Sequence, residues 1–162
     1  MKTTLKNKRK FDRIDSNIIR ILQKEGRISY TDLADRVGLS TTPCMERVKR
    51  LEKDGVILGY HARINPEALD YNMLVFVEIS LSYQSPDAFA RFSEAIAGFP
   101  YILECHLVSG DTDYLIKARI SDMSQYRELL GEMLLRIPGV RNSKSYIVME
   151  EVKETHILPV DS

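Results

Sequence analysis

The sequence has few of the residues that form disulfides, bind zinc or cross membranes. It holds only two cysteines, Cys44 and Cys105, which are far apart and have no CxxC spacing. A disulfide framework or a structural zinc site is therefore not expected, and Cys44 is interpreted as a small buried apolar residue. No apolar run approaches membrane-spanning length, and the basic residues 1–10 lack the apolar stretch that a signal peptide needs. These absences predict a cytoplasmic protein.

Residue patterns typical of catalysis are also missing. There is no Ser-His-Asp set, no phosphate-binding loop and no GxGxxG motif. The three histidines are scattered without metal-ligand or catalytic spacing: His61, His106 and His156. Glu104, Asp111 and Asp113 are conceivable acid–base carboxylates, but a turn at the surface of a small sheet excludes water poorly. The sequence therefore predicts a protein that is not an enzyme and needs no metal or cofactor.

The formal net charge is zero, but the charge is unevenly distributed along the chain. Residues 1–60 hold 14 Lys and Arg against 8 Asp and Glu, whereas residues 61–162 hold 9 against 15. This asymmetry indicates an N-terminal part that meets a polyanion and a C-terminal part that does not. The first ten residues are strongly basic, and fit either an arm that touches phosphates or a solubilising tail.

Apolar periodicity predicts three helices in quick succession near the N-terminus. The first covers residues 12–25, with Asp12 as its cap and an apolar stripe along one side. Ser29 can cap a second, shorter helix, and Gly38 supplies a left-handed turn residue after it. The third helix covers residues 39–54. The last two helices, joined by a tight turn, form a helix-turn-helix, in which the second helix enters the DNA major groove.

The third helix begins at a recognisable signal. Thr42 is placed to cap it, and Pro43 suits the first helical position because its missing N–H would have no helical partner. After Gly55, residues 56–65 are rich in strand formers and predict a two-stranded ribbon. The N-terminal domain, residues 11–65, is therefore expected to be a winged helix-turn-helix.

The third helix carries a mostly basic outer face opposite its apolar face. Hydroxyls and free N–H groups at the start of a helix bind phosphates or base edges, and the arginine fork suits guanine. The predicted DNA-binding residues are Ser40, Thr41, Thr42, Arg47, Lys49 and Arg50. A basic helix face alone is more often a solvated surface. The tight turn, the capped helix and the net positive charge together favour double-stranded DNA as partner.

The second half of the chain, residues 72–155, alternates between strand and helix patterns. The expected strands are residues 74–82, 102–110, 113–121 and 142–152, and the expected helices are residues 85–99 and 121–137. The order β-α-β-β-α-β implies a ferredoxin-like sheet with both helices on one face, and an α+β fold for the whole chain.

Such a sheet has one face without helices. Burying its apolar area stabilises by roughly 25 cal/mol per Å², so we expect dimerisation through this domain. The residues that could supply the surface are Phe76, Leu103, Cys105, Leu107, Tyr146 and Val148, although alternation does not fix which face each takes.

The turn at residues 109–114, SGDTDY, is the second informative motif. Gly110 allows a tight turn whose exposed N–H groups can hold a carboxylate, and Asp113 can hold an ammonium group. Together they suit the two ends of a free α-amino acid. Two alternatives remain: a plain hairpin turn whose aspartates bond their own backbone, and, more weakly, a calcium site.

Motifs in both halves resemble the Lrp/AsnC family, the feast/famine regulators of bacteria and archaea. In the first half they are DRIDSNIIRILQKEGRIS and DLADRVGLSTTPCMERVKRLEKDGVI, and in the second LVSGDTDYLIKARISDM and PGV…SYIVMEEVK. The likeness covers nearly the whole chain from Phe11, with a departure at Thr41, where proline is usual. It implies a winged helix-turn-helix followed by a RAM-type domain that dimerises, assembles into octamers or larger forms, and binds an amino acid between dimers.

The resemblance also implies which residues bind the effector. These are Leu107, Gly110, Thr112, Asp113, Tyr114, Met123, Tyr146, Ile147 and Val148. Leu107 and Met123 would then wall an apolar pocket. Leucine is the expected effector, and other apolar or sulfur-containing amino acids fit the same chemistry.

The sequence thus predicts a nucleoid-associated transcriptional regulator of amino-acid metabolism that binds specific DNA sequences. Its oligomeric state or its DNA binding is expected to respond to an amino acid, leucine first. An architectural nucleoid protein that bends or wraps DNA regardless of effector is the main alternative. A small metabolic enzyme, or its amino-acid-sensing regulatory subunit, is a third, with the helical unit binding protein. Salt-dependent DNA binding and its response to amino acids would separate the three.

Overall fold

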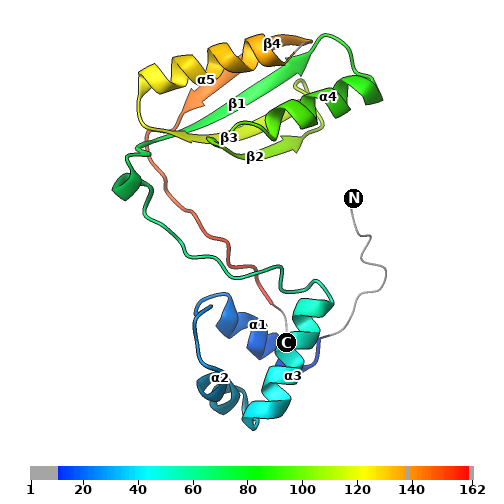
Figure 1. Cartoon of the computed structure of the whole chain (residues 1–162), viewed down its shortest axis with the longest axis vertical. Helices are drawn as coiled ribbons and strands as arrows, with labels where there is room; N and C mark the ends of the chain where they lie inside the picture. Colours follow the sequence, from blue (N-terminus) through cyan, green and yellow to red (C-terminus); the bar gives the residue numbers. More distant parts are fainter. Residues whose placement is uncertain (1–10, 138, 161–162) are drawn as a thin grey trace. The chain divides into compact units, whose positions relative to one another are not determined.

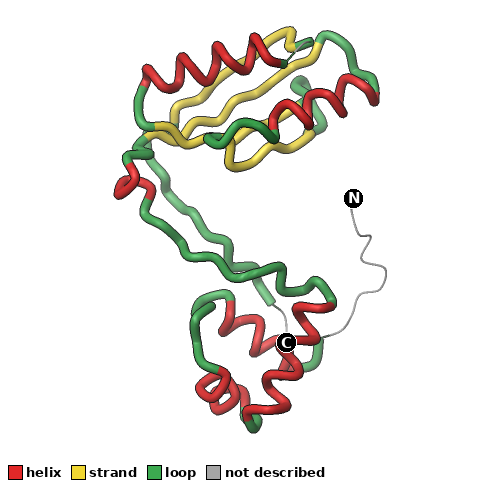
Figure 2. Tube along the Cα trace, in the orientation of Figure 1, coloured by secondary structure: helices red, strands yellow, loops and turns green. Residues whose placement is uncertain are grey.

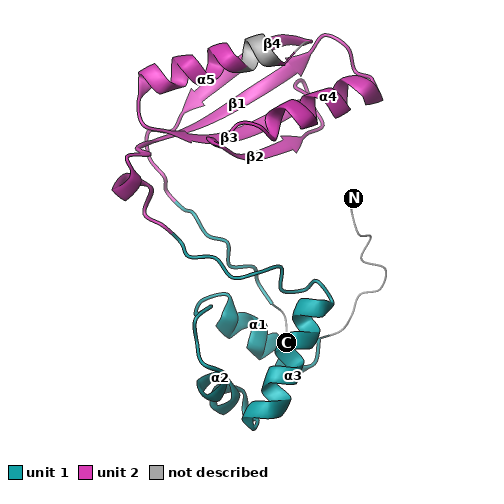
Figure 3. Ribbon diagram, viewed as in Figure 1, with its two compact units in different colours: residues 1–63, 153–162 teal, residues 64–152 magenta. Residues whose placement is uncertain are grey.

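The computed structural model describes residues 11–137 and 139–160, without the side chains of residues 133–136. The basic arm at residues 1–10 therefore lies outside the described residues. The described chain forms two compact units, residues 11–63 with 153–160, and residues 64–152 (Figure 3). No helix of the described chain is long and apolar enough to cross a bilayer.

Three helices form the first unit: α1 (Arg13–Leu22), α2 (Tyr30–Val37) and α3 (Thr41–Lys53) (Figure 1). As predicted, Asp12 caps α1, accepting the backbone N–H of Asp15 at 2.7 Å, and Ser29 caps α2. The apolar faces of the helices pack together around Cys44, which is fully buried as expected. The other buried apolar residues of this core are Ile18, Leu33, Ala34, Val37, Val48 and Leu51.

A tight turn joins α2 to α3, which confirms the predicted helix-turn-helix. Gly38 has a φ of 72°, a left-handed conformation that a Cβ atom disfavours. The N–H of Leu39 then reaches back to the carbonyl of Ala34 at 2.9 Å, closing the end of α2. The turn leads directly into α3.

The start of α3 differs from the prediction by two residues. Ser40, not Thr42, is the N-cap, and the first helical bond runs from the N–H of Cys44 to the carbonyl of Ser40 at 3.2 Å. Pro43 is therefore the third helical residue. Its missing N–H is still among the first-turn groups that have no partner within the helix, so the proline is tolerated there too.

The two-stranded ribbon expected at residues 56–65 does not form. The segment contains no strand and is drawn as loop throughout in Figure 2. It makes no reverse turn that would pair it with itself. Instead Arg63 pairs with Glu154 of the C-terminal segment, with 3.2 Å between guanidinium and carboxylate.

The second unit is the ferredoxin-like sheet that the pattern predicted. Its strands are β1 (Met73–Leu81), β2 (Ile102–Leu107), β3 (Tyr114–Ile120) and β4 (Val140–Ile147), and its helices are η1 (Pro66–Leu69), α4 (Pro86–Ile96) and α5 (Met123–Arg136). The strands run antiparallel in the order β2-β3-β1-β4. Ser85 caps α4, with Pro86 at its first position.

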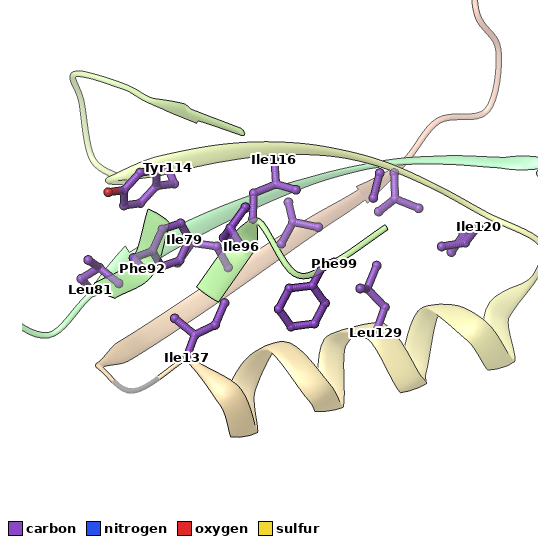
Figure 4. Packing of buried hydrophobic residues seen from close by; sticks show 13 residues of the cluster. Ile79, Leu81, Phe92, Ile96, Phe99, Tyr114, Ile116, Ile120, Leu129 and Ile137 are labelled. Carbon is purple, nitrogen blue, oxygen red and sulfur yellow. The ribbon is translucent and has the colours of Figure 1, made fainter. Parts of the chain in front are cut away.

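Both helices cover the same face of this sheet, as predicted. Alternate residues of β1 and β3 point at them, and Figure 4 shows Phe92 of α4 and Leu129 of α5 within one core. Phe92 stacks on Tyr114 of β3, with 4.0 Å between ring centroids. This stacking places the start of β3 firmly in the core.

The other face of the sheet is uncovered by helices and is mixed in character. Phe76 lies opposite Tyr146 on it, and alternation places Val148 there too. Cys105, by contrast, packs against the helix-covered core, and Leu107 lies opposite Tyr114 in the register of that same side. Cys105 and Leu107 therefore do not belong to the uncovered face, contrary to the prediction.

Candidate DNA and effector sites

The outer face of α3 presents polar and basic groups to solvent. Thr41, Thr42 and Lys49 are exposed, and the side chain of Arg50 is 51% exposed. Ser40 makes no side-chain cap bond to its own helix, so its hydroxyl does not satisfy the first-turn N–H groups. Those N–H groups and the positive end of the helix dipole favour an anion at the start of α3.

Arg47, in contrast, is bound within the protein. Its Nη1 lies 2.5 Å from an Asp12 oxygen and 2.8 Å from an Asp15 oxygen. Asp12 raises the pKa of the Arg47 guanidinium, and the Asp15 N–H and Arg47 together lower the pKa of Asp12. Arg50 also donates to Asp15, with 2.6 Å from Nη2 to the second carboxylate oxygen. The six predicted DNA-binding residues thus divide into a pair tied to carboxylates at the start of α1, and a set that the structure leaves exposed: Ser40, Thr41, Thr42 and Lys49.

The two aspartates were not recognised as part of this surface from the sequence. Capping by itself predicts no contact between Asp12 and the third helix. A signal was present, because Asp15 lies three residues before Ile18, on the face of α1 that packs inward. A carboxylate on such a face needs a cation from the helix it packs against.

The turn between β2 and β3 forms a short hairpin loop. The N–H of Val108 donates to the carbonyl of Asp113 at 2.9 Å, enclosing residues 109–112. Gly110 has a φ of 139°, which a residue with a Cβ rarely adopts. Gly110 and Asp111 are exposed at the tip of the loop.

The Asp113 side chain is buried and already has two partners. One oxygen accepts the backbone N–H of Leu81 at 2.7 Å, and the other accepts the side-chain amide of Gln84 at 2.8 Å. These bonds tie the base of the loop to the end of β1. Both bonds run to residues outside the turn and not to its own backbone, so the structure gives Asp113 an anchoring position.

The remaining predicted effector residues fall into two groups at opposite ends of the sheet. Leu107 and Thr112 lie at the β2–β3 turn, while Met123 begins α5 beyond the far end of β3 (Figure 1). Tyr146, Ile147 and Val148 are at that far end too, since Ile147 pairs with Val75 near the start of β1. The length of β3, at about 3.3 Å per residue, separates the groups by roughly 20 Å.

The exposure of these residues also differs. Leu107, Met123, Tyr146 and Ile147 are each at least 40% exposed, whereas Tyr114 is 4% exposed and belongs to the core. A cavity of about 330 Å³ exists elsewhere in the unit, between the end of β1, the start of α4 and Gly139. It contains none of the predicted effector residues.

Comparison with known proteins accounts for both units. A winged helix-turn-helix DNA-binding family model matches residues 11–57, and the Lrp/AsnC ligand-binding domain model matches residues 74–158. The second match alone covers more than half of the chain. The chain belongs to the Lrp/AsnC family. Its two domains are those of a DNA-binding transcriptional regulator that takes a ligand.

Individual Lrp/AsnC relatives are similar along most of their length. The chain is 58% identical over 149 residues to the leucine-responsive regulatory proteins of Klebsiella pneumoniae and of Escherichia coli K12, covering 92% of this chain and 91% of each relative. A transcriptional regulator from Neisseria meningitidis, solved as a complex with L-Met, matches with a TM-score of 0.88 and 33% identity, covering 94% and 98% of the two chains. An AsnC family regulator from Agrobacterium tumefaciens matches with a TM-score of 0.88 and 38% identity, covering 92% and 97%.

Proposed function

We propose that this protein regulates transcription of amino-acid metabolism genes by binding specific DNA sequences, and that a free amino acid, leucine first, changes that binding or the protein's assembly. The observation that carries the DNA part is the exposed face of α3, with Thr41, Thr42, Lys49 and Arg50 on one helix of a helix-turn-helix. The ligand-binding domain match and the names of the similar proteins support the effector part.

On the DNA side, we assign direct contacts to the exposed members of the predicted set. Ser40, Thr41 and Thr42 would bind phosphates at the start of α3, and Lys49 and Arg50 would reach bases or phosphates along its outer face. Arg47 is bound to the carboxylates of Asp12, the cap of α1, and of Asp15 within α1, and its role is to hold α3 in place.

On the effector side, we propose that the pocket is shared between two copies of the chain. Leu107, Gly110 and Thr112 lie at one end of the sheet, and Met123 with residues 146–148 at the other, so one chain does not bring them together. If the β2–β3 turn of one copy packs against the opposite end of the sheet of another copy, the two together would supply the apolar walls and N–H groups of a pocket. Asp113 anchors the turn, and Tyr114 supports it from the core.

Such a pocket requires an oligomer. The sheet face without helices offers Phe76, Tyr146 and Val148 for a dimer contact. The same face carries the ion pair of Lys117 with Glu104, and Glu78, which accepts from the Tyr146 hydroxyl. Dimers that meet at the effector turns would then build an octamer or a larger assembly. As a DNA-binding regulator the protein would act in the cytoplasm, at the nucleoid, without enzymatic activity or a bound cofactor.

The deciding experiment is a DNA-binding titration of the full chain on the DNA upstream of its own gene, across a salt series, with and without leucine. Steep salt dependence, preference for this fragment over shuffled DNA and a shift with leucine are expected. Preferential binding that leucine leaves unchanged would move the search to methionine and other amino acids. Binding without sequence preference or effector response would favour an architectural role, and no binding at low salt would reject the proposal.

A complementation experiment tests the shared pocket. Leu107→Asp and Met123→Asp each place a charge at an exposed position of the proposed pocket, and each variant alone should lose leucine binding while staying folded. Mixed oligomers that contain both variants should regain part of the leucine binding, because some pockets then receive two intact walls. A pocket within one chain would show no such recovery.

A further inference from the structure

Asp15 stands at the contact between α1 and α3, and its carboxylate is the centre of a small ionic cluster. Its side chain is only 8% exposed. One oxygen accepts from Arg47 at 2.8 Å, and the other accepts from Arg50 at 2.6 Å. A buried carboxylate without partners is strongly unfavourable, so these two bonds hold both guanidinium groups in place.

The two arginines are held in different states. Arg47 is bound by Asp12 as well as Asp15, and its side chain is 27% exposed. Among the described residues only Asp15 binds Arg50, whose side chain stays 51% exposed. Because a guanidinium has several further N–H donors, Arg50 keeps donors that can face outward while one donor is fixed.

We propose that Asp15 is a positioning residue for DNA recognition. It holds Arg47 in the contact between α1 and α3, and it orients Arg50 toward the bases. This inference rests on the proposed contact of α3 with DNA. A guanidinium that is ordered before binding loses less conformational entropy when it meets a base, and its planar fork is already oriented. An arginine released from Asp15 would instead bind the nearest phosphate, and phosphates are alike in every DNA sequence.

The proposal predicts a loss of discrimination rather than a loss of binding. Asp15→Asn keeps the shape of the side chain but removes the charge that holds Arg47 and Arg50. Binding to the protein's own upstream DNA should weaken by about tenfold, and binding to shuffled DNA of the same composition should strengthen, so that the ratio of the two affinities falls. The salt dependence should steepen by up to about one unit, since a released arginine is free to neutralise a phosphate.

Two controls separate positioning from general effects. Asp35→Asn makes the same change in net charge on the exposed side of α2, and Asp35 is not a partner of Arg47 or Arg50. It should strengthen binding to both DNAs equally and leave their ratio unchanged. Asp15→Glu keeps the charge but moves the carboxylate by one methylene, so the ratio should fall without a steeper salt dependence. This variant tests the inference even if Asp15→Asn does not fold.

The closing measurement is a double-mutant cycle in the full chain. If Asp15 acts through Arg50, then Asp15→Asn should not lower the ratio further in a protein that already carries Arg50→Ala. An equal fall in both backgrounds, or an unchanged ratio with only a lower unfolding midpoint, would overturn the positioning role and leave the regulator intact. A wild-type protein that does not bind the DNA would reject the proposed function itself, and this inference with it.

Discussion

The role of Asp113 allows a sharp test, because its charge and its bonds can be removed separately. In Asp113→Asn one oxygen can still accept the Leu81 N–H, and the new amide can donate to Gln84 once the exposed Gln84 amide turns over. Both bonds survive in neutral form, so the expected cost is about 1 kcal/mol. In Asp113→Ala the buried Leu81 N–H loses its acceptor, which costs about 1–3 kcal/mol.

Thermal and urea unfolding measure these differences directly. A loss of about 2 kcal/mol corresponds to a fall of roughly 4–8 °C in Tm for a chain of this size, and Asp113→Asn should show about half of that. Asp111→Ala, at an exposed position of the same turn, is the matched control and should change Tm little. Leucine binding, measured by calorimetry on the same proteins, should be retained in Asp113→Asn.

Two results would refute this reasoning. If Asp113→Asn is stable but no longer binds leucine, the carboxylate holds the effector's ammonium group and is more than an anchor. If Asp113→Ala is as stable as the wild type, the bonds to Leu81 and Gln84 do not hold the turn.

Four further changes test other parts of the structure. Lys49→Ala should lower the slope of log affinity against log salt by about one unit, as a salt titration on DNA would show, and an unchanged slope would remove Lys49 from the interface. Phe92→Ala should lower the free energy of unfolding, measured in urea, by about 3–5 kcal/mol, because it removes a buried ring from the hydrophobic core of the second unit. A loss under about 1 kcal/mol would contradict this packing. Gln23→Leu removes the two bonds of the Gln23 amide to the Leu158 backbone, at 3.1 and 2.6 Å, so hydrogen exchange at the Leu158 amide should accelerate while the sheet amides keep their rates. The pKa of Asp12 is lowered by the Asp15 N–H and then by Arg47, so its contribution to stability is present above about pH 4 and is lost as the pH falls further. In Asp12→Asn the unfolding midpoint should therefore change less between about pH 4 and pH 2 than it does in the wild type.

Local chemistry made several elements readable from the sequence. Asp12 and Ser29 cap their helices, and Ser85 with Pro86 opens α4, because capping depends on neighbours within one turn. Strand β3 alternates cleanly between buried and half-buried residues, because one of its faces lies under the helices, whereas β1 is also buried at Leu74 and Ser80. The order of these elements, β-α-β-β-α-β, then predicts the ferredoxin-like sheet. The cap of α3 was misassigned because Thr42-Pro43 fits a first turn at more than one position.

The sequence by itself determined the type of each domain, the tight turn at Gly38 and the basic character of α3, since all three follow from spacing along one segment. Only the tertiary structure decided which groups are free. Arg47 is occupied because α1 brings Asp12 and Asp15 against it, and the Asp113 carboxylate is occupied because β1 ends beside it. The packing of the elements also separates the predicted effector residues, which lie in two groups a strand length apart. Contacts between distant segments depend on how the elements pack, and no local pattern encodes them.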